Sequence, residues 1–347
     1  MDRGQRVEMS ELTEENAVEY LEGRLDLRAN GAEVTALGGG ISNQVIMVRW
    51  DNGCAVLKQP FPKLRVEEDW PADLRRIHIE TSALRLYDRL VRESGLSRVS
   101  IPEVLDEDRE NHLVIMGCIP LEAAGMWKTE LLAGQVDLSV AERVGELLGK
   151  VQARSAQDPW VREEFAFKEH FDELRIDPYH RTAAANNPDV APLIGEEEKR
   201  IMGVGMSIVH GDYSPKSVMV DRSQDPPRLW LFDMEVAHWG DPSFDTGFML
   251  NHLFIKSMHR REEQEAYLEA AMRFWRAYDR STPWDIEFST VKELGVLMLS
   301  RVDGKSPVEY ISSEETWETL REVAKRSLRD DTRDLGSFAD LVREVSA

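Results

Sequence analysis

One stretch of the chain, residues 210–247, constrains the fold more than any other. It runs HGDYSPKSVMVDRSQDPPRLWLFDMEVAHWGDPSFDTG. Two short apolar runs, residues 218–220 and 229–232, flank a turn rich in Asp, Ser, Gln and Pro, which predicts a β-hairpin. Asp212 precedes the first run and Asp233 follows the second. The hairpin is therefore expected to hold both carboxylates over one reaction centre.

This arrangement resembles a kinase catalytic loop followed by a metal-binding loop. The triplet His210-Gly211-Asp212 is similar to that of the aminoglycoside phosphotransferase, choline kinase and methylthioribose kinase superfamily, which has HGD where protein kinases have HRD. The resemblance implies that Asp212 orients the hydroxyl of a small-molecule substrate and takes its proton late. It also implies that Asp233 holds Mg²⁺ on the phosphates of ATP, that His210 supports the loop, and that Asp245 ties the loop to the following helix.

The same resemblance assigns roles to residues near the two aspartates. Most kinases carry an asparagine five residues after the catalytic aspartate as a ligand of a second Mg²⁺, and Ser217 stands there, as serine does in methylthioribose kinases. Since hydroxyl and carboxylate oxygens are hard ligands, the expected metal residues are Ser217, Asp233 and Glu235. The two carboxylates point the same way only if the backbone between them is extended. Lys216 is a candidate for the γ-phosphate, with a solvated lysine as the alternative.

A glycine-rich segment, residues 38–43, lies nearer the N-terminus between expected strands at 33–37 and 45–50. A turn at 51–53 then leads into a strand at 54–58. Glycines let backbone amides approach a phosphate closely, and small polar side chains add hydrogen bonds. The nucleotide-binding residues expected in the segment are Gly39, Gly40, Ser42 and Asn43.

Lys58 ends that strand and, on the kinase template, contacts the α- and β-phosphates while a helix glutamate holds it in place. A helix is expected over residues 74–91, and Glu80 is the expected partner; Glu67, Glu68 and Glu93 lie near or beyond the helix ends. The run AVLKQPFPKLRVEEDWPADLRRIHIETSAL resembles methylthioribose kinases in particular. It has Lys-Gln after the strand, a Trp-Pro pair and a basic helix start that leads into Ile-Glu.

Two more strands, at residues 101–105 and 112–117, are expected on either side of an acidic turn at 106–111. The second would lead into an interlobe hinge near residues 116–119. There adenine would pair with backbone groups, which makes Met116 and Cys118 the expected nucleotide-binding positions.

Most of the remaining chain carries apolar residues at helical spacing. Helices are expected at residues 138–153, 195–204, 244–258, 262–278, 289–301, 314–328 and 335–345. Residues 165–181, rich in aromatic residues and histidine, are expected to pack in the core, with a place in the substrate site as the alternative.

The whole pattern predicts an α+β, two-lobe, protein-kinase-like fold. Its N-terminal nucleotide-binding lobe, residues 1–118, is an antiparallel sheet with a helix. Its catalytic and substrate-binding lobe, residues 119–347, is mostly helical.

Composition narrows the function classes further. The chain has 347 residues with 42% hydrophobic and 31% charged residues, which is typical of a soluble globular protein. The formal charge of -21 argues against nucleic-acid binding. An acidic surface can attract a cationic substrate, although more often it only maintains solubility. The absence of an apolar run or signal-peptide core predicts no membrane association and a cytoplasmic location. Cys54 and Cys118 match no metal spacing and are expected to be reduced, buried and structural.

The acceptor is the least constrained part of the prediction. Methylthioribose kinases hold the sugar with adjacent arginines on a late helix, whereas here a single Arg301 is followed by Val302. The favoured acceptor is methylthioribose or a related small sugar. The alternatives are an aminoglycoside or an amino alcohol of the choline or homoserine type. A nucleotide-binding pseudokinase is the non-enzymatic alternative, suggested by Ser217. The oligomeric state stays open, a homodimer included.

Overall fold

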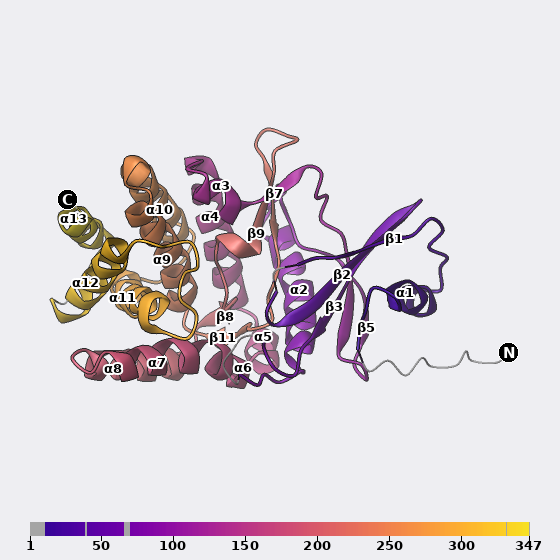
Figure 1. Cartoon of the computed structure of the whole chain (residues 1–347), viewed down its shortest axis with the longest axis horizontal. Helices are drawn as coiled ribbons and strands as arrows, with labels where there is room; N and C mark the ends of the chain where they lie inside the picture. Colours follow the sequence, from indigo (N-terminus) through magenta and orange to yellow (C-terminus); the bar gives the residue numbers. More distant parts are fainter. Residues whose placement is uncertain (1–10, 39, 66–69, 331, 347) are drawn as a thin grey trace. The chain divides into compact units, whose positions relative to one another are not determined.

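The structure is a computed structural model that describes residues 11–38, 40–65, 70–330 and 332–346. It divides into two compact units, one of Met1–Asp88 with Ile101–Pro120 and the other of Arg89–Ser100 with Leu121–Ala347. Figure 1 labels their helices and strands. Three residues for which roles were considered, Gly39, Glu67 and Glu68, lie outside the described residues.

The first unit is built on a five-stranded sheet in which every neighbouring pair is antiparallel. The strand order is β1-β2-β3-β6-β5. The strands are β1 (Glu33–Ala36), β2 (Asn43–Trp50), β3 (Gly53–Pro60), β5 (Val104–Asp108) and β6 (Leu113–Gly117). The prediction for residues 101–111 was wrong in its boundaries, because Asp106 and Asp108 lie within β5 and not in a turn.

Two helices accompany this sheet. Helix α1 (Ala17–Leu25) packs Tyr20 and Leu21 against apolar side chains of the central strands, including Ile46 and Leu57. Asp108 tolerates its strand position because it lies on the edge strand and accepts hydrogen bonds from Tyr20 and from the following turn. Helix α2 (Arg76–Glu93) follows β3.

The second unit contains two small sheets. One has the order β4-β10-β9-β7, and the other pairs β11 with β8. The strands are β4 (Val99–Ser100), β7 (Ala124–Met126), β8 (Ser207–Val209), β9 (Val218–Asp221), β10 (Arg228–Leu231) and β11 (His238–Gly240). The predicted hairpin is confirmed, since β9 and β10 are antiparallel neighbours with Leu231 opposite Val218.

Helices make up most of the rest of this unit. They are α3 (Trp127–Leu132), α4 (Leu138–Ser155), α5 (Pro159–Glu164), α6 (Glu169–Phe171), α7 (Thr182–Asn186), α8 (Ala191–Gly203), α9 (Ser243–His259), α10 (Gln264–Asp279), α11 (Glu287–Asp303), α12 (Glu314–Arg329) and α13 (Leu335–Ser346). Figure 1 shows α9 to α13 gathered together. Helix α10 packs on α4 at Gly145, where any side chain would collide with the backbone of Phe274.

A ten-residue π-helix, η1 (Asp172–Arg181), runs between α6 and α7. It contains Pro178, which has no backbone N–H to donate. The core prediction for this region holds for most of its large side chains, because Phe171, Tyr179 and His180 are buried. A π-helix is rare and is often found at functional sites, which makes the side chains of η1 candidates for a functional role.

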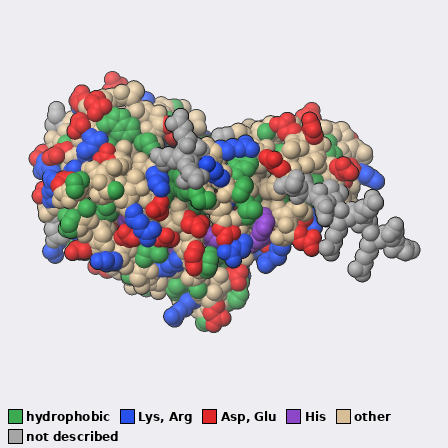
Figure 2. Space-filling view, turned by 60° about the horizontal axis from the view of Figure 1, so that its bottom comes forward, with side chains coloured by type: hydrophobic (Ala, Val, Ile, Leu, Met, Phe, Trp, Pro, Cys, Tyr) green, Lys and Arg blue, Asp and Glu red, His purple; other side chains and the backbone are tan. Residues whose placement is uncertain are grey.

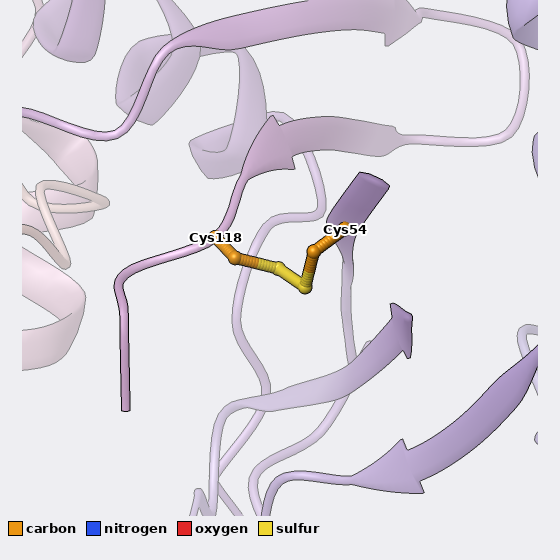
Figure 3. Close-up of a disulfide and its surroundings, with 2 residues drawn as sticks. All are labelled: Cys54 and Cys118. Carbon is orange, nitrogen blue, oxygen red and sulfur yellow. A yellow bond between two sulfur atoms is a disulfide. The ribbon is translucent and has the colours of Figure 1, made fainter. Parts of the chain in front are cut away.

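The two cysteines form a disulfide, with Cα atoms 5.7 Å apart (Figure 3). The prediction that they are reduced was therefore wrong. The reason lies in the pairing of β3 with β6. Ala55 is opposite Gly117, so one step further along the antiparallel register Cys54 faces Cys118. A separation of 64 residues in sequence hides this neighbourhood.

None of the helices among the described residues is long and apolar enough to cross a bilayer. On the face of the molecule drawn in Figure 2, acidic and basic side chains lie interspersed.

Candidate active site

The HGD loop follows strand β8 and is held to helix α9 by a buried carboxylate. Asp245 accepts hydrogen bonds from the backbone N–H of His210 at 2.7 Å and from that of Gly211 at 2.9 Å. The side-chain amide of Gln152 donates a third bond to Asp245 at 3.0 Å. Burial nevertheless raises the pKa of Asp245 to about 7, because three hydrogen bonds do not fully replace the lost water.

The glycine of the triplet is required by the backbone. Gly211 has a φ of 77°, a conformation that side chains with a Cβ rarely adopt. A Cβ at this position would lie 2.7 Å from the carbonyl oxygen of Val236. The loop therefore passes closer to its neighbour than any other residue type would permit.

His210 links the loop that precedes β9 to the residue that follows β10. Its Nε2 lies 3.2 Å from the carbonyl oxygen of Phe232, and its Nδ1 accepts the backbone N–H of Asp212 at 3.2 Å. Burial lowers the pKa of His210 to about 4, so the ring is neutral, with its proton on Nε2 to serve the carbonyl. The ring thus holds the loop of Asp212 against the residue that precedes Asp233.

One carboxylate oxygen of Asp212 forms ion pairs, and the other accepts no hydrogen bond from the described residues. Its Oδ2 lies 2.9 Å from a guanidinium nitrogen of Arg175 and 2.7 Å from the ammonium of Lys216. Its Oδ1 is buried and accepts no hydrogen bond from the described residues. A buried carboxylate oxygen without a donor is costly, and an incoming hydroxyl would satisfy it.

Arg175 was not singled out by the sequence analysis. It projects from η1, is 8% exposed, and also donates to the carbonyl of Gly211 at 2.7 Å. Against burial, which lowers it, the charge of Asp212 raises the pKa of Arg175, and Glu235 and Asp233 act in the same direction. The only local signal was an arginine between Leu174 and Ile176, close to a proline that interrupts a helical pattern.

Lys216 lies four residues after Asp212, and its side chain is 46% exposed. Its ammonium is close enough to Asp212 for an ion pair, so it is both partly solvated and part of the site. Against desolvation, which lowers it, the charges of Asp212 and Asp233 raise the pKa of Lys216. It remains a cation in the neutral range.

The three expected metal residues lie at the same end of the hairpin. Asp233 follows β10 with a φ of 69°, which is uncommon for a residue other than glycine and typical of functional sites. Glu235 begins a turn, so the backbone between the two carboxylates is not extended. Against burial, which lowers it, both charges help to raise the pKa of Arg175. The hydroxyl of Ser217 donates to the carbonyl of Asp212 at 2.8 Å, which leaves its lone pairs available.

In the first unit, Lys58 on β3 forms an ion pair with Glu80 on α2, with the ammonium 2.8 Å from the carboxylate oxygens. The two residues are 6% and 1% exposed. A buried ion pair of this kind holds the lysine in one position.

The described part of the glycine-rich segment is anchored by a residue that sequence reasoning also missed. Arg76 is fully buried and donates to the carbonyls of Ser42 at 2.6 Å and Phe61 at 3.0 Å. The side-chain amide of Asn43 donates to the hydroxyl of Ser42 at 3.0 Å. The carbonyl of Asn43 lies 3.3 Å from where a Cβ on Gly40 would be. A guanidinium therefore fixes the end of this segment.

The two expected adenine-binding positions lie at the end of β6. Met116 is in the strand and 7% exposed, while Cys118 follows it and is bonded to Cys54. Arg301, the expected substrate residue, lies in the last turn of α11 and donates to the hydroxyl of Ser306 at 2.8 Å.

The chain is also similar to known proteins. The sequence model described as the phosphotransferase enzyme family matches residues 33–284. The chain is similar to a 4-hydroxytryptamine kinase of Psilocybe cyanescens, with 24% identity over 80% of this chain and 82% of that protein. It is also similar to a methylthioribose kinase of Geobacillus sp. (strain WCH70), with 26% identity over 81% of this chain and 72% of the relative.

Solved structures share the fold. A microcompartment-associated aminopropanol kinase aligns with a TM-score of 0.52 and 14% identity, over 88% of this chain and 95% of that one. A choline/ethanolamine kinase family protein from Mesorhizobium loti aligns with a TM-score of 0.50 and 17% identity, over 95% and 92%. The predicted α+β, protein-kinase-like fold is thereby confirmed.

Proposed function

Since this chain belongs to the phosphotransferase enzyme family, we propose that it transfers the γ-phosphate of ATP to a hydroxyl of a small sugar or similar metabolite, with Asp212 as the hydroxyl-orienting base. The chain is a small-molecule kinase, a phosphotransferase with an alcohol group as acceptor. One observation carries the assignment of Asp212. Its Oδ2 is held by two cations, while its buried Oδ1 has no donor among the described residues.

The open oxygen is placed to accept the proton of a substrate hydroxyl. A sugar hydroxyl is a weak acid, so Asp212 mainly orients it and takes the proton as the new bond forms. Arg175 and Lys216 fix the direction of the carboxylate. Phosphoryl transfer depends chiefly on such positioning and on neutralisation of charge.

Nucleotide use is common to the kinase relatives, and the donor oxygens of this chain also fit Mg²⁺. Mg²⁺ is held in proteins by one or two carboxylates, with waters and phosphates as further ligands. Asp233 and Glu235 supply two carboxylates, and the described part of the chain holds no group of three or more His, Cys, Asp or Glu side chains that could bind a metal ion. When bound, Mg-ATP supplies the phosphoryl group and the charge that neutralises it.

Further residues of the nucleotide site are proposed on the same grounds. Lys58, fixed by Glu80, would bind the α- and β-phosphates, and Ser217 would complete the metal site. The segment around Gly40, Ser42 and Asn43 would cover the phosphates, and the end of β6 at Met116 and Cys118 would bind adenine through its backbone.

Two acceptor classes follow from the relatives. Methylthioribose is favoured by the resemblance of the first unit and by the serine at position 217. An amino alcohol is the alternative, since a relative phosphorylates a hydroxytryptamine and solved structures of the same fold include an aminopropanol kinase. Ser217 remains the one feature that favours a nucleotide-binding protein without turnover.

The test is turnover with Mg-ATP on a panel of hydroxyl compounds: methylthioribose, other pentoses, choline, homoserine, aminopropanol and an aminoglycoside. ADP release is followed, and the phosphorylated product is identified by mass. Asp212→Asn is the blank, because it keeps the shape of the side chain and removes its basicity. Product that disappears in the blank supports the proposal. Equal turnover by Asp212→Asn, or ATP binding without turnover on any compound, contradicts it.

A further inference from the structure

We propose that the acceptor carries an acidic group, a carboxylate or a phosphate, which binds a cluster of cations beside the catalytic aspartate. The inference rests on the proposed kinase function, and it selects an acidic acceptor, such as homoserine or a sugar phosphate, in place of methylthioribose or choline. The cluster consists of Lys128 on α3, Lys256 on α9 and Arg301 on α11. We call it the cationic cluster.

The cluster is short of negative charge. Lys128 pairs with Glu309 at 2.6 Å, and the Glu309 side chain is 71% exposed. Neither Lys256 nor Arg301 forms an ion pair with a carboxylate among the described residues. Lys256 is fully buried; among the described residues its ammonium contacts the carbonyl of His252 at 3.4 Å, the hydroxyl of Tyr310 at 3.5 Å and the face of the Tyr310 ring, 5.1 Å from its centroid, and none of these carries a negative charge.

Arg301 shows the same deficit. The residue is 9% exposed, and its Nε is buried without an acceptor. Within the described residues, its side chain donates one hydrogen bond, to the neutral hydroxyl of Ser306. Buried charges are normally paired, so two buried cations without a carboxylate partner among the described residues indicate that an anion from outside the chain completes them.

The pKa values of His252 and Lys256 are both lowered by burial and, in part, by the positive charges of the cluster. Burial, together with the charges of Lys256, Arg301, Lys216 and Lys128, holds the pKa of His252 well below its ordinary value. Burial and the neighbouring Lys128 and Arg301 lower the pKa of Lys256 to about 7, although Glu309 opposes this. An anion bound here would raise both values and would be attracted most strongly when Lys256 is charged.

Helix α9 connects the cluster to the catalytic loop. Asp245, Phe248, His252 and Lys256 follow one another at intervals of three or four residues and so share one side of the helix. Asp245 holds the catalytic loop, and Phe248 stacks on Tyr179 of η1, with centroids 6.1 Å apart. About 16 Å of helix axis separates Asp245 from Lys256, and the ammonium of Lys256 reaches back to the carbonyl of His252, which is about 10 Å along the axis from Asp245. Besides burial, the charge of Lys216, which pairs with Asp212, lowers the pKa of His252.

An acceptor whose hydroxyl and acidic group are several bonds apart would therefore reach both Asp212 and the cationic cluster. The hydroxyl of the acceptor would donate to Oδ1 of Asp212. Its acidic group would bind the accessible nitrogens of Arg301 and Lys128, and the buried Lys256 would add a third positive charge. Methylthioribose and choline carry no acidic group. The net charge of -21 would repel an anion elsewhere on the surface, which makes a local excess of cations more informative.

The experiment has two arms on the full chain. In the first, kcat/KM is compared within matched pairs: homoserine against its methyl ester, and ribose 5-phosphate against ribose. We expect at least a tenfold preference for the acidic member of one pair, and which pair responds distinguishes carboxylate from phosphate. Arg301→Gln and Lys128→Gln should abolish the preference. The control Arg273→Gln, a surface ion-pair residue on α10, should keep it.

The second arm does not depend on turnover. Inorganic phosphate and, separately, acetate are titrated while thermal unfolding is followed. Phosphate or acetate should raise the melting temperature of wild type and of Lys58→Met, which lacks the lysine of the first unit, but not that of Arg301→Gln or Lys256→Met. Lys256→Met also removes a buried charge and should be at least as stable as wild type without anion.

The two arms separate failure of this inference from failure of the kinase proposal. No turnover on any acceptor, with anion stabilisation lost only in the cluster variants, would refute the kinase and keep the anion site. Turnover of neutral or cationic acceptors with kcat/KM unchanged in Arg301→Gln and Lys128→Gln would overturn the anion site and keep the kinase. Anion stabilisation that is equal in wild type and in the cluster variants would also overturn it.

Discussion

Arg175 and Asp212 meet at 2.9 Å, the guanidinium of one against Oδ2 of the other, while the second carboxylate oxygen stays open. The same guanidinium donates to the carbonyl of Gly211, so Arg175 binds the loop and its carboxylate together. The aspartate is thereby oriented before any substrate arrives. Catalysis of phosphoryl transfer depends largely on groups that are positioned in advance in this way.

Replacement of Arg175 should therefore slow turnover without weakening nucleotide binding. We expect Arg175→Lys, which keeps the charge but loses the forked donor, to lower kcat roughly 10- to 100-fold with little change in the KM for ATP. Steady-state kinetics measures this, with the acceptor that the panel of hydroxyl compounds identifies. Arg181→Gln is the matched control, an arginine of the same π-helix that pairs with surface carboxylates. A folded Arg175→Lys with wild-type kcat would exclude a positioning role.

The pair of Lys58 and Glu80 gives a prediction for nucleotide affinity. Lys58→Met should weaken ATP binding at least about tenfold, since it removes the cation proposed for the phosphates. Glu80→Gln should weaken it in the same direction, because the lysine loses its fixed position. Calorimetric titration with a non-hydrolysable ATP analogue measures both. Glu93→Gln, on the same helix and paired with Arg154, should bind as wild type does. Unchanged affinity in Lys58→Met would rule out the assignment.

Asp245 makes stability depend on pH. Its pKa is raised by burial from 3.8 to about 7, so the folded protein holds a proton that the unfolded chain releases between these values. This contribution is fully present below the unfolded pKa and is lost as the pH rises through about 7, by at most about 4 kcal/mol. Urea unfolding between about pH 5 and pH 8 should show a shallower loss in Asp245→Asn than in wild type. Equal slopes would show that Asp245 does not titrate in this range.

The disulfide should be measurable directly. Intact protein is expected to have a mass lower by two hydrogens than protein treated with a reductant, and to take up alkylating agent only after reduction. Replacement of Cys54 and Cys118 together by serine should lower the free energy of unfolding by about 2–4 kcal/mol. Urea unfolding checks this, with reductant added to wild type as the parallel case. Free thiols in protein that was never reduced would contradict the bond.

Local sequence patterns were sufficient to predict those parts of the site that lie within one continuous segment of the chain. The spacing of apolar runs and turn residues predicted the hairpin, and the HGD triplet and its glycine follow from one loop's backbone. Helical periodicity predicted α4 and α9 to within one or two residues at each end. The choice of Glu80 from four glutamates depended on its place within a helix, and the structure pairs it with Lys58.

Contacts between distant segments were not predictable in the same way. Arg175 lies on a π-helix, whose wider turn breaks the 3.6-residue period that the sequence analysis used. The register that sets Cys54 against Cys118 depends on which strands become neighbours. An aspartate in strand β5 was taken for a turn residue because its hydrogen-bond partner, Tyr20, lies 88 residues away.

By itself, the sequence of this protein determined its reaction class and its fold, because those depend on residue types at short, fixed spacings along one strand, loop or helix. Only the tertiary structure decided how the Asp212 carboxylate is held and which cations separate helices contribute to one cluster. Lys128, Lys256 and Arg301 come from three helices, and no spacing in the chain relates them. Their mutual repulsion arises only when packing removes water from between them, and that depends on the whole folded chain.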